Sequence, residues 1–152
     1  MTDIFTRIKE DHDKARELIS EIEATTDRAA KKREELFEKF KIDLWSHNKV
    51  EEATFYSKLT AKGDEDESLE AKNEHHMVNA LLEELDTMPK DNKEWAQKFH
   101  TMVELLEHHM EEEEDEFFEL GRKEFSKEEA EELGKKFDAR KKVVMPALSP
   151  VE

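Results

Sequence analysis

Residues 47–56 read HNKVEEATFY, and residues 109–118 read HMEEEEDEFF. The two stretches lie 62 positions apart, and each has a histidine, a glutamate four residues later and two adjacent aromatic residues at its end. A spacing of four residues places the histidine and the glutamate on one face of a helix. The chain therefore contains two copies of a helix with a His-x3-Glu motif.

A further histidine precedes each copy at nearly the same distance. His12 lies 35 residues before His47, and His75 lies 34 residues before His109. The chain thus has a doubled unit, in which a helix with one histidine, a turn and a His-x3-Glu helix follow one another.

Apolar side chains follow three- and four-residue steps in four segments, as they do along the inner faces of a helical bundle. Short turns between helices of about 20 to 30 residues favour an all-α, up-down-up-down four-helix bundle. Gly121 is expected to end the fourth helix. The polar breaks between the segments fall at residues 24–27, 63–66 and 87–92.

A short extra C-terminal helix follows the bundle. Residues 126–129, Ser-Lys-Glu-Glu, have capping-box spacing and predict a helix over about residues 127–141. The proline-containing tail, residues 146–150, is expected to be irregular. We therefore expect the bundle to span residues 1–121, and residues 122–152 to pack on it.

The composition limits the classes of partner. Charged residues make up 43% of the 152 residues, but nine phenylalanines on helical stripes argue against disorder. The net charge of −16 argues against nucleic-acid and anionic-membrane partners. The chain has no cysteine, which excludes thiolate metal sites and disulfides. With no long apolar segment and no apolar leader, we expect a soluble, cytoplasmic protein.

Six polar residues interrupt the apolar stripes. A single buried histidine is most simply explained by a hydrogen bond within the core. Two buried glutamates are harder to explain, because an unpaired carboxylate costs several kcal/mol in a core and no Lys or Arg lies on these stripes. A bound metal would neutralise them, so these residues are the candidate metal ligands: His12, His47, Glu51, His75, His109 and Glu113.

The spacing of these residues predicts that they meet. In antiparallel neighbours, residues at one height are equally distant from the turn that joins the helices. The midpoints of the pairs His12/His47, Glu51/His75 and His75/His109 are 29.5, 63 and 92, each at or near a predicted turn. At about 1.5 Å per residue, all six side chains are expected in one layer.

The ligand types indicate the metal. Imidazole and carboxylate without sulfur suit iron, manganese or zinc, and not copper(I) or an iron–sulfur cluster. Six ligands exceed the needs of one tetrahedral zinc, whereas two metals bridged by two glutamates use them all and leave positions for solvent, an oxo bridge or a small ligand. Glu114 is the alternative to Glu113. We expect His76 and His108 to be exposed, and Tyr56 to cover the end of the bundle.

The motifs resemble those of the hemerythrin-like, or HHE cation-binding, family over about residues 3–121. The resemblance implies an up-down four-helix bundle around a non-haem di-iron site that handles or senses O2, peroxide, nitric oxide or iron. Oxygen-carrying members have a further histidine where this chain has Asn79, and a His-x4-Asp motif instead of the last His-x3-Glu. The matching residues are Asp11-His12, His47 to Glu52 with Phe55-Tyr56, Glu74-His75, and His109 to Glu114 with Phe117-Phe118.

Three functions follow as hypotheses. The first is a di-iron protein that binds, senses or turns over a small oxidant, with oxidoreductase activity left open. The second is a non-catalytic iron sensor or store, in which metal stabilises the bundle and a protein partner reads the folded state. The third is a structural site, such as zinc, in an interaction module. The departures from oxygen carriers favour redox chemistry, peroxide handling or sensing over reversible oxygen transport.

Overall fold

The computed structural model describes residues 2–148, and within that range it is helical with no strand. The prediction of an all-α chain is therefore confirmed. The elements are α1 (Ile4–Glu23), the 3-10 turn η1 (Asp27–Ala29), α2 (Ala30–Glu51), the π-helical turn η2 (Glu52–Tyr56), α3 (Ser57–Ala61), α4 (Glu65–Thr87), α5 (Lys93–Glu112), the π-helical turn η3 (Glu113–Phe117), α6 (Phe118–Glu124) and α7 (Lys127–Leu148).

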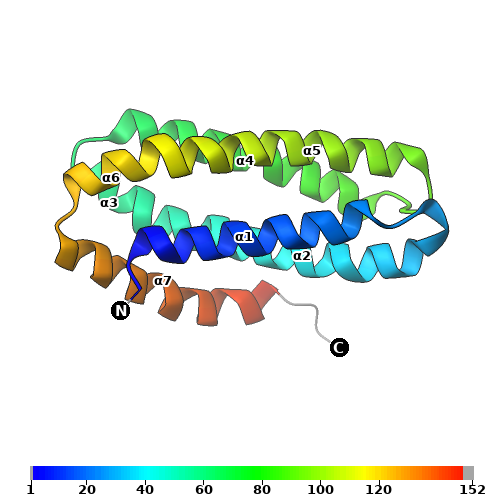
Figure 1. Cartoon of the computed structure of the whole chain (residues 1–152), viewed down its shortest axis with the longest axis horizontal. Helices are drawn as coiled ribbons and strands as arrows, with labels where there is room; N and C mark the ends of the chain where they lie inside the picture. Colours follow the sequence, from blue (N-terminus) through cyan, green and yellow to red (C-terminus); the bar gives the residue numbers. More distant parts are fainter. Residues whose placement is uncertain (1, 149–152) are drawn as a thin grey trace.

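These elements form long rods that lie side by side (Figure 1). The helices α2 and α3 continue through η2 as one rod, and α5 and α6 continue through η3 as another. Successive rods run in opposite directions, with α1 packed on α2 and α4 packed on α5. The last helix, α7, packs along α1 and α2 on the outside of this arrangement.

The C-terminal helix begins as the sequence predicts but is longer. The backbone N–H of Glu129 donates to Ser126 Oγ at 3.0 Å, and the N–H of Ser126 donates to Glu129 Oε1 at 2.9 Å, which makes the capping box. The helix then continues to Leu148 and includes Pro146, so the predictions of a short helix and of an irregular tail from residue 146 are wrong. Residues 149 and 150 lie outside the described range. Leu133, Phe137 and Lys141 are buried at four-residue intervals, and α7 packs against α1 and α2. Beyond the predicted end, Val144 is half-buried and packs against the cluster that includes Phe137.

Gly121 does not end the fourth rod, because α6 continues to Glu124. The glycine is instead required by close packing. A Cβ atom at this position would lie 2.8 Å from Cε1 of Phe5 and 3.1 Å from Cε2 of Phe55. Gly63, in contrast, has a φ of 104° and forms the turn between α3 and α4, as expected for a helix C-cap.

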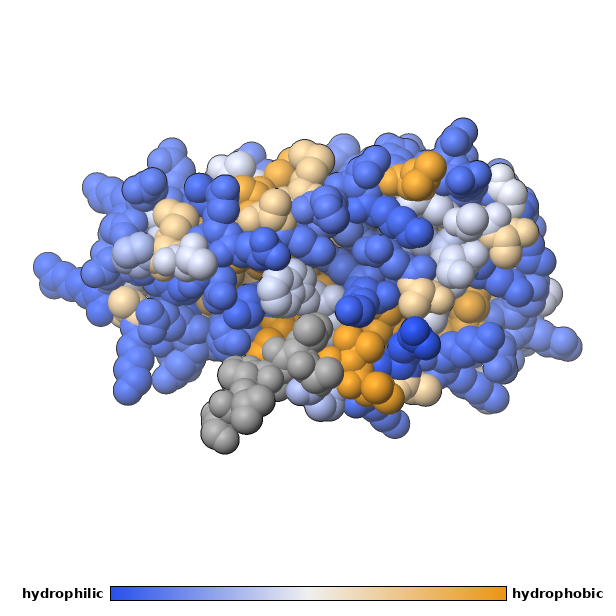
Figure 2. Space-filling model, turned by 180° about the vertical axis from the view of Figure 1, so that it is seen from behind, coloured by the Kyte–Doolittle hydropathy of each residue, from blue (hydrophilic) through white to orange (hydrophobic). Residues whose placement is uncertain are grey.

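The apolar core has two clusters with a polar layer between them. One cluster includes Phe37, Trp95 and Phe99, and the other includes Phe55 and Phe137. The six predicted ligands come from chain positions between those of the two clusters. The outer surface is largely hydrophilic in the view of Figure 2, in keeping with the charge content of the chain.

Candidate metal centre

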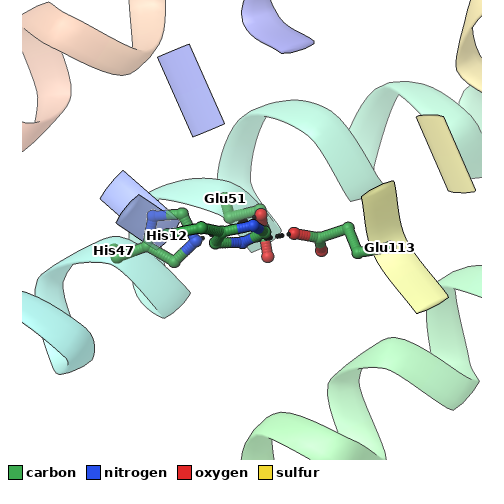
Figure 3. Close-up of side chains that lie close together, drawn as sticks. All are labelled: His12, His47, Glu51 and Glu113. Atoms are coloured by element: carbon green, nitrogen blue, oxygen red, sulfur yellow. Dashed lines mark ion pairs between the residues drawn. The ribbon is translucent and has the colours of Figure 1, made fainter. Parts of the chain in front are cut away.

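The structure brings all six predicted ligands together inside the bundle. Each side chain is buried, and Glu51 and Glu113 have no exposed surface. The residues form two overlapping groups of four that share both glutamates, and within each group the potential ligand atoms lie within 4.8 Å of one another. One group is His12, His47, Glu51 and Glu113 (Figure 3), and the other is Glu51, His75, His109 and Glu113.

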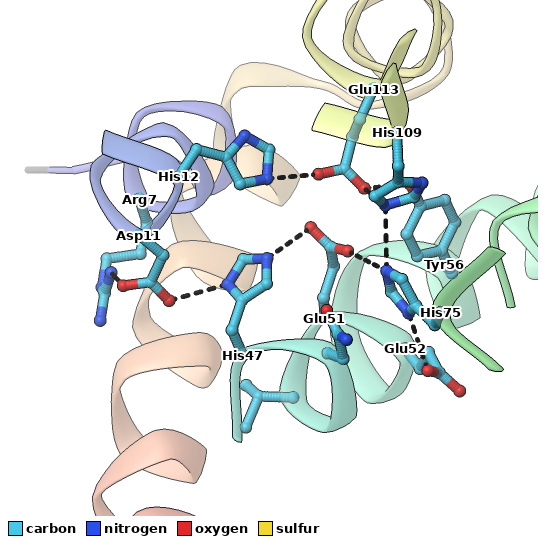
Figure 4. Close-up of polar contacts among 12 residues, drawn as sticks. Arg7, Asp11, His12, His47, Glu51, Glu52, Tyr56, His75, His109 and Glu113 are labelled. Atoms are coloured by element: carbon cyan, nitrogen blue, oxygen red, sulfur yellow. Dashed lines mark hydrogen bonds and ion pairs between the residues drawn. The ribbon is translucent and has the colours of Figure 1, made fainter. Parts of the chain in front are cut away.

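Each glutamate faces one histidine from each half of the chain (Figure 4). Glu51 Oε2 lies 3.2 Å from His47 Nε2, and Glu51 Oε1 lies 3.1 Å from His75 Nε2. Glu113 Oε1 lies 2.9 Å from His12 Nε2, and Glu113 Oε2 lies 3.5 Å from His109 Nε2. The arrangement of the two carboxylates suits bridging between two cations, each with two terminal imidazoles.

The outer nitrogen of every one of these histidines contacts a second carboxylate. Asp11 and Glu74, which precede His12 and His75 in the sequence, hold the His-x3-Glu histidine of their own unit. Glu52 and Glu114, which follow the two shared glutamates, hold the first histidine of the opposite unit. The Nδ1 distances are 2.8 Å for His47–Asp11, 2.7 Å for His109–Glu74, 2.8 Å for His75–Glu52 and 2.6 Å for His12–Glu114.

These outer carboxylates fix the orientation of the rings. A carboxylate that accepts from Nδ1 leaves Nε2 to face inward and makes it a better metal ligand. Glu114 contacts His12 from outside the centre, which favours Glu113 over Glu114 as the inner carboxylate. The sequence analysis missed the roles of Asp11, Glu52 and Glu74, although each adjoins a predicted ligand.

A π-helical turn occurs at the equivalent place in both units. The turn η2 begins directly after Glu51, and η3 begins at Glu113. A π-helical turn contains an extra residue, changes the direction of the side chains that follow, and is frequent at functional sites. Two adjacent aromatic residues are buried at the end of each turn: Phe55 and Tyr56, and Phe117 and Phe118.

The electrostatics of the centre are those of a buried network of imidazoles and carboxylates. Burial alone lowers the pKa of His47, but Glu51 and Asp11 raise it to about 9. Burial alone raises the pKa of Glu113, but His109 and His12 hold it well below its usual range. Neighbouring glutamates likewise raise the pKa values of His12, His75 and His109 against the effect of burial. Without metal, the carboxylates therefore favour the protonated form of these imidazoles, and burial opposes it.

Several polar atoms in the layer are nevertheless left without hydrogen bonds. They are His47 Nε2, both carboxylate oxygens of Glu51, and Glu113 Oε1, all of which are buried. Each of these atoms lies 2.9 to 3.2 Å from an atom of another candidate ligand without forming a hydrogen bond to it. In addition, the Nε2 atoms of His75 and His109 face one another at 3.1 Å. Buried polar atoms normally have hydrogen-bond partners, so nitrogen and oxygen atoms held this close without one fit cation binding.

Tyr56 does not cover the end of the bundle. It is fully buried beside the polar layer, and its hydroxyl donates a hydrogen bond to Glu113 Oε2. The prediction that Tyr56 covers the end of the bundle is therefore wrong. The repeat contained a signal, because the residue equivalent to Tyr56 in the second unit is Phe118, which has no hydroxyl. His76 and His108 are exposed, as predicted.

A cavity between α1 and α2 reaches the centre. At its outer end, Lys14 Nζ and Asp43 Oδ2 form an ion pair of 3.1 Å between the two helices. Its inner end includes three of the candidate ligand histidines. The remaining lining combines the apolar Ala15, Leu44, Leu106 and Met110 with the polar Asp11, Asn48 and Lys141. The cavity gives a small molecule a path to the His12 and His47 side of the site.

The fold and this layer of histidines and glutamates define an all-helical cation-binding domain. The sequence matches the family described as hemerythrin HHE cation binding domain over residues 3–120, and the chain belongs to that family. The structure is similar to the crystal structure of a hemerythrin HHE cation binding domain-containing protein from Mycobacterium kansasii. The TM-score is 0.86 at 25% sequence identity, with 97% of this chain and 90% of that chain covered.

A curated relative has a different kind of name. The chain is 25% identical over 141 residues to a protein named DNA nickase from Nostoc sp. (strain PCC 7120 / SAG 25.82 / UTEX 2576). The match covers 93% of this chain but spans about two fifths (40%) of the relative's length.

No described helix is long and apolar enough to cross a membrane.

Proposed function

We propose that the chain is a non-haem di-iron protein that binds, senses or turns over a small oxidant such as O2, peroxide or nitric oxide. The observation that carries this proposal is the pair of overlapping four-residue groups that share Glu51 and Glu113. Two cations between shared carboxylates use every inner nitrogen and oxygen of the layer. Nitrogen and oxygen ligands without sulfur favour iron, with manganese or zinc as alternatives.

In this proposal His12 and His47 are the terminal ligands of one cation, and His75 and His109 are those of the other. Bound iron supplies redox chemistry and free coordination positions. The protein orients the imidazoles through the outer carboxylates and excludes bulk water by burial. Tyr56 positions Glu113 through its hydroxyl.

The cavity supports a small ligand rather than a large substrate. Leu44 and Leu106 line it next to the histidines, and the Lys14–Asp43 ion pair crosses its outer end. Small neutral molecules fit a partly apolar passage of this kind. Whether the reaction is binding or turnover depends on the chemistry after the ligand arrives, so an oxidoreductase activity is a proposal to be measured.

Anaerobic purification followed by metal counting and visible spectroscopy tests the proposal. We expect about two irons per chain and a ligand-to-metal absorption band that changes when O2, peroxide or nitric oxide is added. One zinc per chain and a featureless spectrum would overturn it.

Three substitutions assign the metal to the buried layer. His47→Ala and Glu113→Ala each remove a proposed ligand and are expected to lower the iron content sharply. The matched control is His76→Ala, which removes an exposed histidine next to the proposed ligand His75. Equal loss of iron in all three variants would contradict the assignment.

A second candidate is a non-catalytic iron sensor or store. The unpaired atoms of Glu51 and Glu113 support it, because a cation that satisfies them stabilises the folded chain. Iron-dependent stability with no spectral response to oxidants would favour this function, in which a protein partner reads metal occupancy.

The remaining proposals concern organisation and partners. We propose that residues 1–121 form the metal-binding unit as an up-down four-helix bundle, and that residues 122–152 pack on it; the match over residues 3–120 supports this division. The net charge of −16 leads us to propose no nucleic-acid partner, in spite of the relative's name. The absence of cysteine favours the cytoplasm.

A further inference from the structure

The two halves of the centre have the same inner residues but different surroundings. On the His12 and His47 side, both outer carboxylates form ion pairs with lysine and arginine side chains. Asp11 Oδ1 accepts from Arg7 Nη1 at 2.6 Å, and Asp11 Oδ2 accepts from Lys141 Nζ at 2.8 Å. Arg16 Nη1 lies 3.1 Å and Lys9 Nζ 3.8 Å from the carboxylate of Glu114.

On the His75 and His109 side, no lysine or arginine of the described residues pairs with an outer carboxylate. Among the described residues, Glu52 and Glu74 form no ion pair with any Lys or Arg, and each pairs instead with its histidine. Lys49 lines the same surface groove as Glu52 without pairing with it. Near Glu74 the neighbouring charge is instead negative, because Glu74 and Glu112 are close enough for the Glu74 carboxylate to raise the pKa of Glu112.

The C-terminal helix creates much of this difference. Lys141 comes from α7 and pairs with Asp11 alone, whereas Arg7 is shared with Asp138, and Arg16 with Asp13 and Glu107. The ring of Phe137, also on α7, packs on the ring of His47 with a centroid distance of 5.6 Å. Both side chains are buried. The helix therefore encloses one half of the centre and adds a positive charge to it.

These lysine and arginine side chains are expected to weaken metal binding at the His12 and His47 position. A carboxylate that is already paired with lysine and arginine is a weaker acceptor for the imidazole N–H, so the imidazole is a weaker ligand. The same positive charges also repel a bound cation directly. Both effects weaken the His12 and His47 position more than the His75 and His109 position, which lies farther from these charges.

We propose that the two cation positions are unequal, that the His75/His109 position fills first and more tightly, and that Lys141 is the positioning residue on α7 that weakens the other. This inference rests on the proposed two-metal centre. It goes beyond that proposal because it assigns the order of filling and gives α7 a role in it.

Zinc binding to the metal-free chain tests the order without any redox step. The double variant His12→Gln/His47→Gln leaves the His75/His109 position, and His75→Gln/His109→Gln leaves the other. Calorimetry is expected to give at least tenfold tighter zinc binding to the first variant. Circular dichroism checks that both are folded. In the unsubstituted chain, NMR signals of the His75 and His109 rings should shift at the first equivalent of zinc.

Lys141 is tested in the variant that retains only the His12/His47 position. Lys141→Met is expected to tighten zinc binding there by roughly fivefold, through removal of one nearby charge, and Lys141→Arg should restore the weaker binding. Lys142→Met is the matched control, because it removes the same charge from an exposed neighbour. A purely structural role of Lys141 would give the opposite sign, since loosening α7 would weaken binding.

The measurements distinguish failure of the two-metal centre from failure of the filling order and from failure of the role of α7. If the unsubstituted chain binds no second zinc, the two-metal proposal itself fails. If it binds two, but the two positions have equal affinity or the His12/His47 rings respond first, the inference is overturned while the two-metal centre stands. Unchanged or weaker binding in Lys141→Met would overturn the role of α7.

Discussion

The Tyr56 hydroxyl, from the first unit of the repeat, donates a hydrogen bond to Glu113, the shared carboxylate of the second unit. No equivalent bond reaches Glu51, because the second unit has Phe118 at the corresponding position. The two shared glutamates thus differ in their hydrogen bonding, although each faces one histidine from each unit. Burial and the nearby carboxylates Glu113 and Glu51 raise the pKa of Tyr56 well above its usual value, so it remains a donor.

Tyr56→Phe should separate positioning from ligation. The variant removes the donor to Glu113 and is expected to lower the free energy of unfolding of the metal-free chain by about 1–2 kcal/mol. The metal content should stay at that of the unsubstituted protein, because the phenol donates to Glu113 and its raised pKa keeps it protonated. Urea unfolding and metal counting measure the two effects. Loss of metal would show instead that the phenol binds it.

The stability of the metal-free chain should fall as pH rises. The pKa of His47 in the folded state is raised to about 9, against about 6.5 in an unfolded chain. The stabilisation is therefore complete below about pH 6.5 and is lost as pH rises through about 9, with about 3 kcal/mol from this residue. Urea unfolding at both ends of this range measures the change. Zinc-loaded protein is the control and should show no such loss, because metal keeps the imidazoles neutral.

Glu74→Gln should weaken metal binding from outside the ligand set. Glu74 accepts from His109 Nδ1 at 2.7 Å, and loss of such an orienting carboxylate typically costs 10- to 100-fold, so we expect about tenfold weaker zinc binding. Calorimetry with the metal-free chain gives the affinity. Glu70→Gln is the matched control, since Glu70 lies one helical turn earlier on α4 and is exposed. A similar loss in both variants would indicate a general effect of surface charge.

Gly134→Ala should destabilise the packing of α7. A Cβ atom there would lie 2.3 Å from the backbone oxygen of Thr2, and backbone cannot rotate away as a side chain can. We expect a loss of about 1–3 kcal/mol in spite of the better helix propensity of alanine. Thermal or urea unfolding measures it. Lys135→Ala, at the exposed next position, should change little; an unchanged Gly134→Ala variant would contradict the close approach.

Much of the polar layer could be predicted because it violates a strong pattern. His12, His47, Glu51 and their counterparts occupy positions where helical periodicity demands apolar residues, and a doubled pattern is unlike chance. The helix start at Lys127 was also predictable, because a capping box is a local signal. These features depend on residues close in sequence or on a simple period.

The outer carboxylates could not be predicted in the same way. Asp11 and Glu74 adjoin ligand histidines, but the chain has 41 acidic residues, so an acidic neighbour carries little information by itself. Their role depends on the relative rotation of neighbouring helices, which periodicity leaves open. The π-helical turns and the continuation of α7 through Pro146 likewise depend on packing between distant segments.

The position of the polar layer between two apolar clusters has a consequence for folding. Each cluster has its own set of aromatic contacts, and the side chains between them are imidazoles and carboxylates instead of apolar groups. Cations that bind residues from α1, α2, α4, α5 and η3 would tie both halves of the interior together. We therefore expect unfolding to be more cooperative in the metal-loaded chain than in the metal-free chain.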